Sequence, residues 1–252
     1  MFEGDNPQIL QAYETALATF KYFWRELSWE RRRIVPGLDM AAVKLPFTDG
    51  PRRDGNPEFE HMWAGDVDFD GLTITARLLN QPNWLTSVQA GQTVQVPVSH
   101  LEDWLLASGG RTCGGFTVNA MRAAMSPAER ADHDAAWGMD FGDPASPRIE
   151  LHAPPGAGIP AAFEDHPMCL NMAPKYQQQL SKDTGPLEYR DGRGWSLLHS
   201  EALAGNVAIA NLLLQFGAHP LDPTPDGRTS IDLARQGGWP EVAAWLSDCC
   251  RS

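Results

Sequence analysis

The C-terminal quarter of the chain repeats its own pattern after 33 residues. The stretch "GWSLLHSEALAG" begins at Gly194, and the similar stretch "GRTSIDLARQGG" begins at Gly227. Under this shift Leu198 corresponds to Ile231. Repeats of this length form units that each leave an apolar face exposed, which only a neighbouring unit can bury. The pattern therefore predicts a stack of helical units at this end of the chain.

The spacing within the repeat indicates its type. A Gly-x-Ser-x-Leu-His core at Gly194–His199, with a period of 33, resembles the ankyrin signature, and residues 191 to about 248 resemble two ankyrin repeats. The resemblance implies a turn and two antiparallel helices per repeat, with the His199 ring bonding neighbouring backbone. Two repeats fall below the usual minimum of about three. We therefore expect a helix over 166–183 to act as an N-terminal cap, with further packing from the N-terminal domain.

The N-terminal half predicts helices and an antiparallel sheet. Residues 6–30 carry one apolar stripe at helical spacing. "SHLE" reads as a capping box that begins a further helix over "DWLLAS", residues 103–108, and Ser126 begins another helix. Strand-like stretches, bounded by turn signals, are found at 40–47, 59–67, 71–79 and 91–98.

These elements define a fold class and three segments. We expect an α+β fold, with an N-terminal antiparallel sheet of about four strands with helices, followed by C-terminal all-α ankyrin-repeat helices. The Pro-, Gly- and Ala-rich stretch after residue 142 indicates a linker. The predicted segments are an α+β domain at 1–145, a linker with a capping helix at 146–185, and two ankyrin repeats at 186–252.

Four stretches of the N-terminal half resemble a YegJ-like bacterial domain of unknown function. They are "AAVKLPF", "FEHMWAGDV", "QTVQVPVSHLEDWLL" and "GGFTVNAMR". The resemblance covers roughly half of the chain and implies no particular activity. It does imply a context, because such domains occur beside toxin genes and fused to ankyrin repeats.

Charge and composition exclude several function classes. The formal net charge is −12, from 32 acidic and 20 basic residues, whereas a nucleic-acid-binding protein needs a basic face. The chain begins without the features of a signal peptide and has no apolar run long enough to span a membrane. Its four cysteines lack metal or disulfide spacing, which favours a reducing compartment. We therefore expect a cytoplasmic protein that binds neither nucleic acid nor membrane.

The motifs that could carry chemistry are weak. Asp66, Asp68 and Asp70 match the opening of a calcium-binding EF-hand loop, but Arg77 occupies the position of its essential bidentate Glu. No phosphate loop, nucleophile elbow or zinc motif is present. We therefore expect no metal, no cofactor and no catalytic residue.

A few catalytic pairings remain open. His61 could pair with Asp103 across the fold, and Cys113 could pair with His100 or His133 as nucleophile and base. A deep pocket lined by His61, Asp103 or Cys113 would favour this alternative.

The first hypothesis is therefore a binding protein. An acidic, cytoplasmic ankyrin protein is expected to act as an immunity protein that neutralises a cognate bacterial toxin of the type VI secretion kind by direct contact. A nuclease is the favoured target, because an acidic surface complements its basic cleft. The alternative is an enzyme or small-ligand-binding N-terminal domain with the ankyrin repeats as a docking arm. The expected partner-binding residues are Glu60, Asp66, Asp68, Asp70, Trp195, Asp226 and Arg228.

Overall fold

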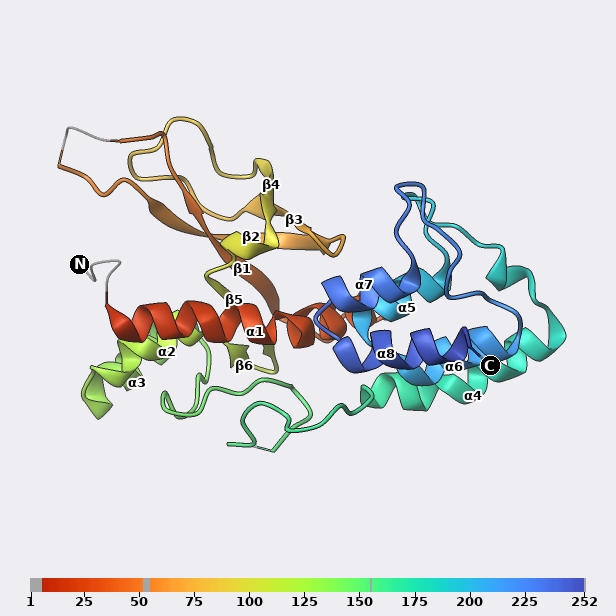
Figure 1. The fold of residues 1–252 in the computed structure, drawn as a ribbon. Coiled ribbons are helices and arrows are strands. Elements are labelled where there is room, and N and C mark those ends of the chain that lie inside the picture. The colour runs from red at the N-terminus through yellow and green to blue at the C-terminus, as the bar shows by residue number, and fades with distance from the viewer. Residues whose placement is uncertain (1–5, 52–54, 155, 252) are drawn as a thin grey trace. The chain divides into compact units, whose positions relative to one another are not determined.

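The computed structural model describes residues 6–51, 55–154 and 156–251 (Figure 1). The chain divides into two compact units. The first comprises Met1–Phe23 and Glu30–Ile159, and the second comprises Trp24–Trp29 and Pro160–Ser252. The segment 146–185, predicted as a linker, is thus shared between the two units. Within the described ranges, no helix combines the length and the apolar character needed to cross a bilayer.

The first unit is built on an antiparallel sheet of six strands in the order β4-β3-β2-β1-β5-β6. The expected number of about four was therefore too low. The strands are β1 Met40–Phe47, β2 Glu60–Phe69, β3 Thr73–Leu78, β4 Thr93–Pro97, β5 Asp103–Ser108 and β6 Arg111–Gly114.

Of the two additional strands, β5 occupies the stretch where a helix was expected, and β6 follows it. "DWLLAS" forms β5 between β1 and β6, and Ser99 lies in the short 3-10 turn η1, Val98–His100. Five consecutive residues of β5 are buried. The apolar run at residues 104–107 is too short for its periodicity to distinguish a strand from a helix, and this explains the wrong prediction.

Helices cover both faces of this sheet. On one face lies α1, Pro7–Glu30. The indole N–H of Trp104 in β5 donates to the carbonyl oxygen of Ala16 at 3.1 Å and contacts the Thr19 hydroxyl at 3.1 Å. On the other face, Leu105 packs with Val118 of α2, Phe116–Ala123. The helix α3, Pro127–Trp137, begins with the capping box expected at Ser126.

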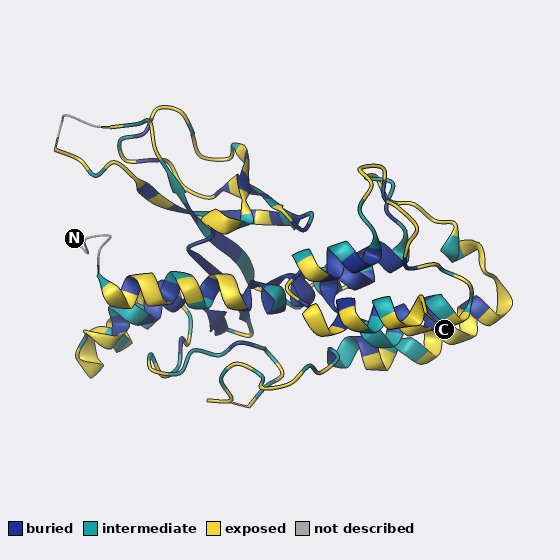
Figure 2. Ribbon diagram, viewed as in Figure 1, coloured by how far each residue is buried: buried dark blue, intermediate teal, exposed yellow. Residues whose placement is uncertain are grey.

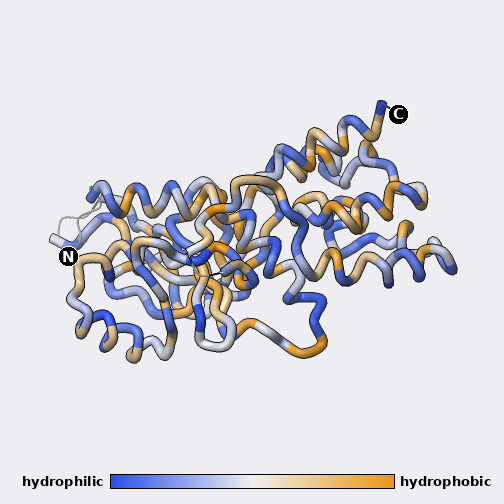
Figure 3. The backbone as a smooth tube through the Cα atoms, turned by 90° about the horizontal axis from the view of Figure 1, so that it is seen from below, coloured by the Kyte–Doolittle hydropathy of each residue, from blue (hydrophilic) through white to orange (hydrophobic). Residues whose placement is uncertain are grey.

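The second unit consists of helices and loops in its described residues. Its main helices are α4 Pro167–Lys182, α5 Leu197–Ala204, α6 Val207–Gln215, α7 Ser230–Gln236 and α8 Pro240–Cys249, and η2, Gly185–Leu187, is a 3-10 turn. The order turn, α5, α6 is repeated as turn, α7, α8. Most of α5 is buried (Figure 2), and hydrophilic and hydrophobic residues alternate along α8 (Figure 3).

Two further segments complete the short stack of repeats. As expected, a helix at the predicted cap position, α4, packs against α6. Residues 24–29 of α1 also belong to this unit. The indole N–H of Trp29 donates to Oδ1 of Asn206 at 3.0 Å, and Nδ2 of Asn206 donates to Glu201 at 2.7 Å. These segments supply the contacts that a third repeat would otherwise give.

Candidate functional site

The two repeat turns have the same hydrogen bonds. In the first, the N–H of Asp191 donates to the carbonyl oxygen of Trp195 at 3.0 Å. In the second, the N–H of Thr224 donates to the carbonyl oxygen of Arg228 at 2.8 Å. A Cβ on Gly194, which has φ +78°, would lie only 2.7 Å from Pro225. The two turns are therefore in contact, and their loops rise together from the helices (Figure 1).

His199 ties these loops together. Its Nδ1 accepts from the N–H of Ser196 at 3.0 Å, and its Nε2 lies 2.9 Å from the carbonyl oxygen of Asp222. This pattern places the proton of the neutral ring on Nε2. Burial lowers the pKa of His199, which keeps the ring neutral. The expected bonding of this side chain to neighbouring backbone is thus found.

Three of the predicted partner-binding residues meet at these turns. Trp195, expected as a partner-binding residue, is only 4% exposed. The guanidinium groups of Arg193 and Arg228 lie over its ring, at 5.1 and 5.3 Å from the centroid. Asp226 pairs with Arg228 at 2.8 Å. The indole is thus a platform under two cations rather than a free surface.

The exposed apolar residues of the loops were missed by the sequence analysis. Tyr189 precedes the first turn and is 56% exposed, while Leu221 precedes the second and is 48% exposed. Neither follows a periodic pattern, so no signal singled them out. We use the name turn surface for Tyr189, Arg193, Trp195, Leu221, Asp226 and Arg228.

The acidic hairpin of the first unit is largely neutralised by its own neighbours. Asp66 pairs with Arg77 at 2.7 Å, and Asp68 pairs with Arg31 at 2.8 Å. Asp70 accepts from the N–H of Thr73 at 2.7 Å within the turn. Asp66 and Asp68 lie in β2, and Asp70 lies in the turn to β3, whereas an EF-hand loop joins two helices. Any partner that uses these carboxylates must compete with two arginines.

Glu60 is not a surface residue. It is 5% exposed, and its Oε1 accepts from the backbone N–H and the side-chain amide of Asn83, each at 2.7 Å. The carboxylate fixes the loop after β3 to the start of β2. Its predicted role in partner binding conflicts with this burial, because its acceptor atoms already serve the fold.

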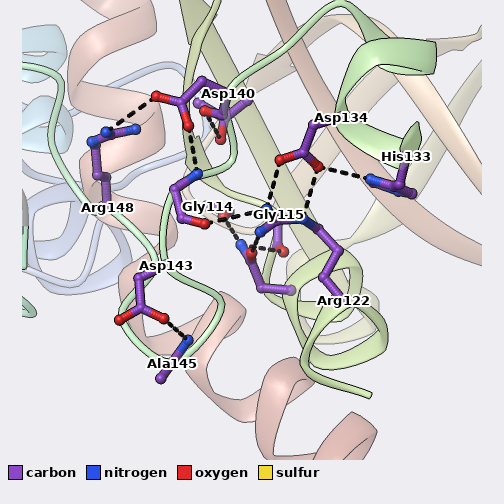
Figure 4. Close-up of polar contacts among 12 residues, drawn as sticks. Gly114, Gly115, Arg122, His133, Asp134, Asp140, Asp143, Ala145 and Arg148 are labelled. Carbon is purple, nitrogen blue, oxygen red and sulfur yellow. Dashed lines mark hydrogen bonds and ion pairs between the residues drawn. The ribbon is translucent and has the colours of Figure 1, made fainter. Parts of the chain in front are cut away.

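The carboxylate of Asp134, between α2 and α3, also serves the fold (Figure 4). Asp134 holds the buried Arg122 through two bonds, of 2.8 Å to Nε and 2.6 Å to Nη2, and contacts Nδ1 of His133 at 3.0 Å. The remaining Arg122 nitrogen donates to Asn119 at 2.6 Å. Bidentate pairing of this kind fixes geometry, so the cluster joins α2 to α3 rather than presenting free charge.

The structure does not pair His61 with Asp103, as one of the catalytic alternatives required. His61 contacts Glu102 at 2.7 Å, in place of Asp103. Asp103 is buried and accepts hydrogen bonds from Phe116 and Thr117 at the start of α2. Cys113 is also buried, which denies a substrate access to its thiol.

The first unit does contain a pocket, but a different set of residues lines it. Glu102 and His100 contribute to the wall, together with Tyr13 of α1. His61, Asp103 and Cys113 are not among the described lining residues. The pocket therefore lacks the groups that would have favoured the enzymatic alternative.

Comparison with known proteins places the chain in a family. Residues 6–141 match the family described as "Uncharacterized protein conserved in bacteria (DUF2314)". The chain belongs to this family. No solved structure matches it.

Similar proteins extend this comparison to both units. A protein of Neisseria meningitidis serogroup B, which carries the name of an ankyrin repeat protein, is 46% identical over 245 residues, covering 97% of this chain and 94% of its own. Escherichia coli YegJ is 31% identical over 94 residues, or 37% of this chain and 57% of YegJ. Human ARF GTPase-activating protein GIT1 is 46% identical over 57 residues, or 23% of this chain and 8% of GIT1.

Proposed function

We propose that this protein acts by binding another protein through the turn surface. The observation that carries the proposal comes from the two turns and the loops before them: Tyr189 and Leu221 are exposed, and two guanidinium groups lie over Trp195. Aromatic residues and arginines are enriched at protein interfaces and dominate their binding energy. The name of the Neisseria relative, an ankyrin repeat protein, supports the same role.

The chemistry of the described residues favours binding over catalysis. Asp103 and Cys113 are buried and engaged in packing or capping, and His199 has both ring nitrogens committed to the loops. These groups hold the fold in place. We therefore propose that the protein is not an enzyme.

The finer proposal concerns the partner. We propose a cognate bacterial toxin of the type VI secretion kind, with a nuclease as the first choice, which this protein neutralises by direct contact. The support is the net charge of −12, since complementary charge speeds encounter with a basic cleft. Co-expression tests it: survival of cells producing the toxin should require this protein. Survival without it, or toxicity despite a formed complex, contradicts the immunity role.

A double variant tests the turn surface. Tyr189→Ala with Leu221→Ala is expected to weaken the partner complex by about 10- to 100-fold, because both side chains are exposed anchors of the size that dominates interfaces. Isothermal titration against the purified partner measures the change. The partner is first obtained by pull-down from the native cells and identified by mass spectrometry.

A matched control lies in the same unit. Leu170 of α4 is exposed to 55% and lies outside the turn surface. Leu170→Ala should bind the partner as the wild type does. Equal affinity of the double variant and the wild type would move the interface away from the turns.

A further inference from the structure

The pocket of the first unit has walls suited to an apolar stem. It has a volume of about 550 Å³, within the range typical of small-ligand sites. Its lining includes Leu17 of α1 and Phe59, which precedes β2. Both side chains are more than two-fifths exposed. Large apolar groups exposed beside a concavity are a common feature of binding sites.

The polar part of the lining is negative. Glu102 is buried among the lining residues, and its carboxylate oxygens lie 2.7 and 2.9 Å from Nδ1 of His61. Glu14 adds a second carboxylate. The described lining residues include no Lys or Arg, and His100 is their one imidazole.

Tyr13 of the pocket wall is affected both by burial and by the nearby carboxylates. Its pKa is raised to about 12, first by burial and then by the charges of Glu102 and Asp103. A negative potential disfavours the phenolate and favours a cation at the same place. The phenol ring of Tyr13 and the ring of Phe59 add aromatic faces, which attract cations.

We propose that this pocket binds an alkylammonium or guanidinium group carried on a short apolar stem. The cation would face Glu102 and Glu14, and the stem would lie along Leu17 and Phe59. A Lys or Arg side chain of a protein has this chemistry, and so has a free small amine. The pocket lies in the first unit, and its occupation does not require the turn surface.

Two probes test the proposal on the full chain. The first is n-butylguanidinium, and the second is the blocked peptide acetyl-Gly-Gly-Arg-Gly-Gly-amide, with n-butylurea as the neutral control for both. Binding is followed by nuclear magnetic resonance shifts of residues 13–17 and 99–102. Stronger binding of the peptide indicates a protein side chain as the source, and stronger binding of the free guanidinium indicates a small molecule.

Variants locate the interaction. Glu102→Gln keeps an acceptor for His61 but removes the charge, and is expected to weaken n-butylguanidinium binding about tenfold. Glu14→Gln, at an exposed position, should weaken it severalfold and serves as a second test if Glu102→Gln does not fold. Glu58 is adjacent in sequence to Phe59 but does not line the pocket. Glu58→Gln should therefore bind n-butylguanidinium as the wild type does. Equal binding of n-butylurea and n-butylguanidinium, or unchanged affinity in both Glu102→Gln and Glu14→Gln, would overturn the proposal.

Discussion

Replacing Asp103 by Ala is expected to destabilise the first unit by about 3–5 kcal/mol. The carboxylate accepts from the backbone N–H groups of Trp104 at 2.8 Å, Phe116 at 3.0 Å and Thr117 at 2.8 Å. It also accepts from the Thr117 hydroxyl at 2.6 Å. The residue that would normally cap α2 is Gly115, which has no side chain to do so. Alanine would leave these buried donors without an acceptor.

Urea unfolding followed by circular dichroism measures this loss. Asp132 lies on the exposed side of α3, and Asp132→Ala should change the free energy of unfolding by less than about 0.5 kcal/mol. If Asp103→Ala were as mild as this control, the capping of α2 by Asp103 would not contribute to stability.

The same carboxyl gives the first unit a defined pH dependence. Burial raises the pKa of Asp103 to about 6, although the hydrogen bonds from Thr117 and Phe116 oppose the shift. Between about pH 4 and pH 6 the folded state therefore keeps a proton on Asp103 that the unfolded chain has released. The stability that this proton gives the folded state is present at low pH and is lost as the pH rises through 6.

A variant isolates this effect from other titrations. The difference in unfolding free energy between wild type and Asp103→Asn should be about 1–2 kcal/mol larger at pH 5 than at pH 7.5. A difference that grows toward high pH would contradict the sign.

Replacing Asn206 by Ala should destabilise the second unit by a similar amount, about 3–5 kcal/mol. The side chain of Asn206 accepts from the indole of Trp29 and donates to the fully buried Glu201. Alanine removes both bonds and takes a partner from a buried carboxylate. Asn211→Ala, at an exposed position of α6, the helix that Asn206 precedes, is the control and should be nearly neutral.

A second substitution tests whether the buried charge of Glu201 causes the loss of stability in Asn206→Ala. Adding Glu201→Gln to Asn206→Ala removes the charge that lost its donor, so the double variant should recover part of the stability. Thermal unfolding of both variants checks this. No recovery would mean that the loss arises from packing rather than from the buried charge.

The sequence alone was sufficient for the elements that depend on local patterns. The 33-residue period predicted two turn-and-helix units, and the hydrogen bonds of Asp191 and Thr224 repeat at that period. The box at Ser126 also begins a helix, as its residues indicated. Such features depend on residues close to one another in the chain, so they can be predicted without a structure.

Features that depend on distant residues could not be predicted. The N-terminus of α2 is capped by Asp103 from β5, and that of α6 is capped by Asp165 from the loop before α4. Residues 24–29 contribute to the repeat stack although they lie far away in sequence. No local signal marks a partner that lies tens of residues away.

The candidate site shows the same division. Trp195, Asp226 and Arg228 were predicted and do come together, but the burial of Trp195 depends on the arginines above its ring. The exposure of Tyr189 depends on how its loop is held and has no sequence signature. The sequence pattern therefore predicts where the turns lie, whereas which side chains the turns expose can be known only from the folded structure.

Hydrogen–deuterium exchange of the partner complex tests the central claim, that the protein recognises its partner through the turn surface, most directly. Backbone amides report protection where binding covers or stiffens a segment. Complex formation is expected to slow exchange in residues 188–195 and 219–229, with little change in the exposed helix α3. Protection confined to the first unit, with the two turns exchanging as in the free protein, would contradict the claim.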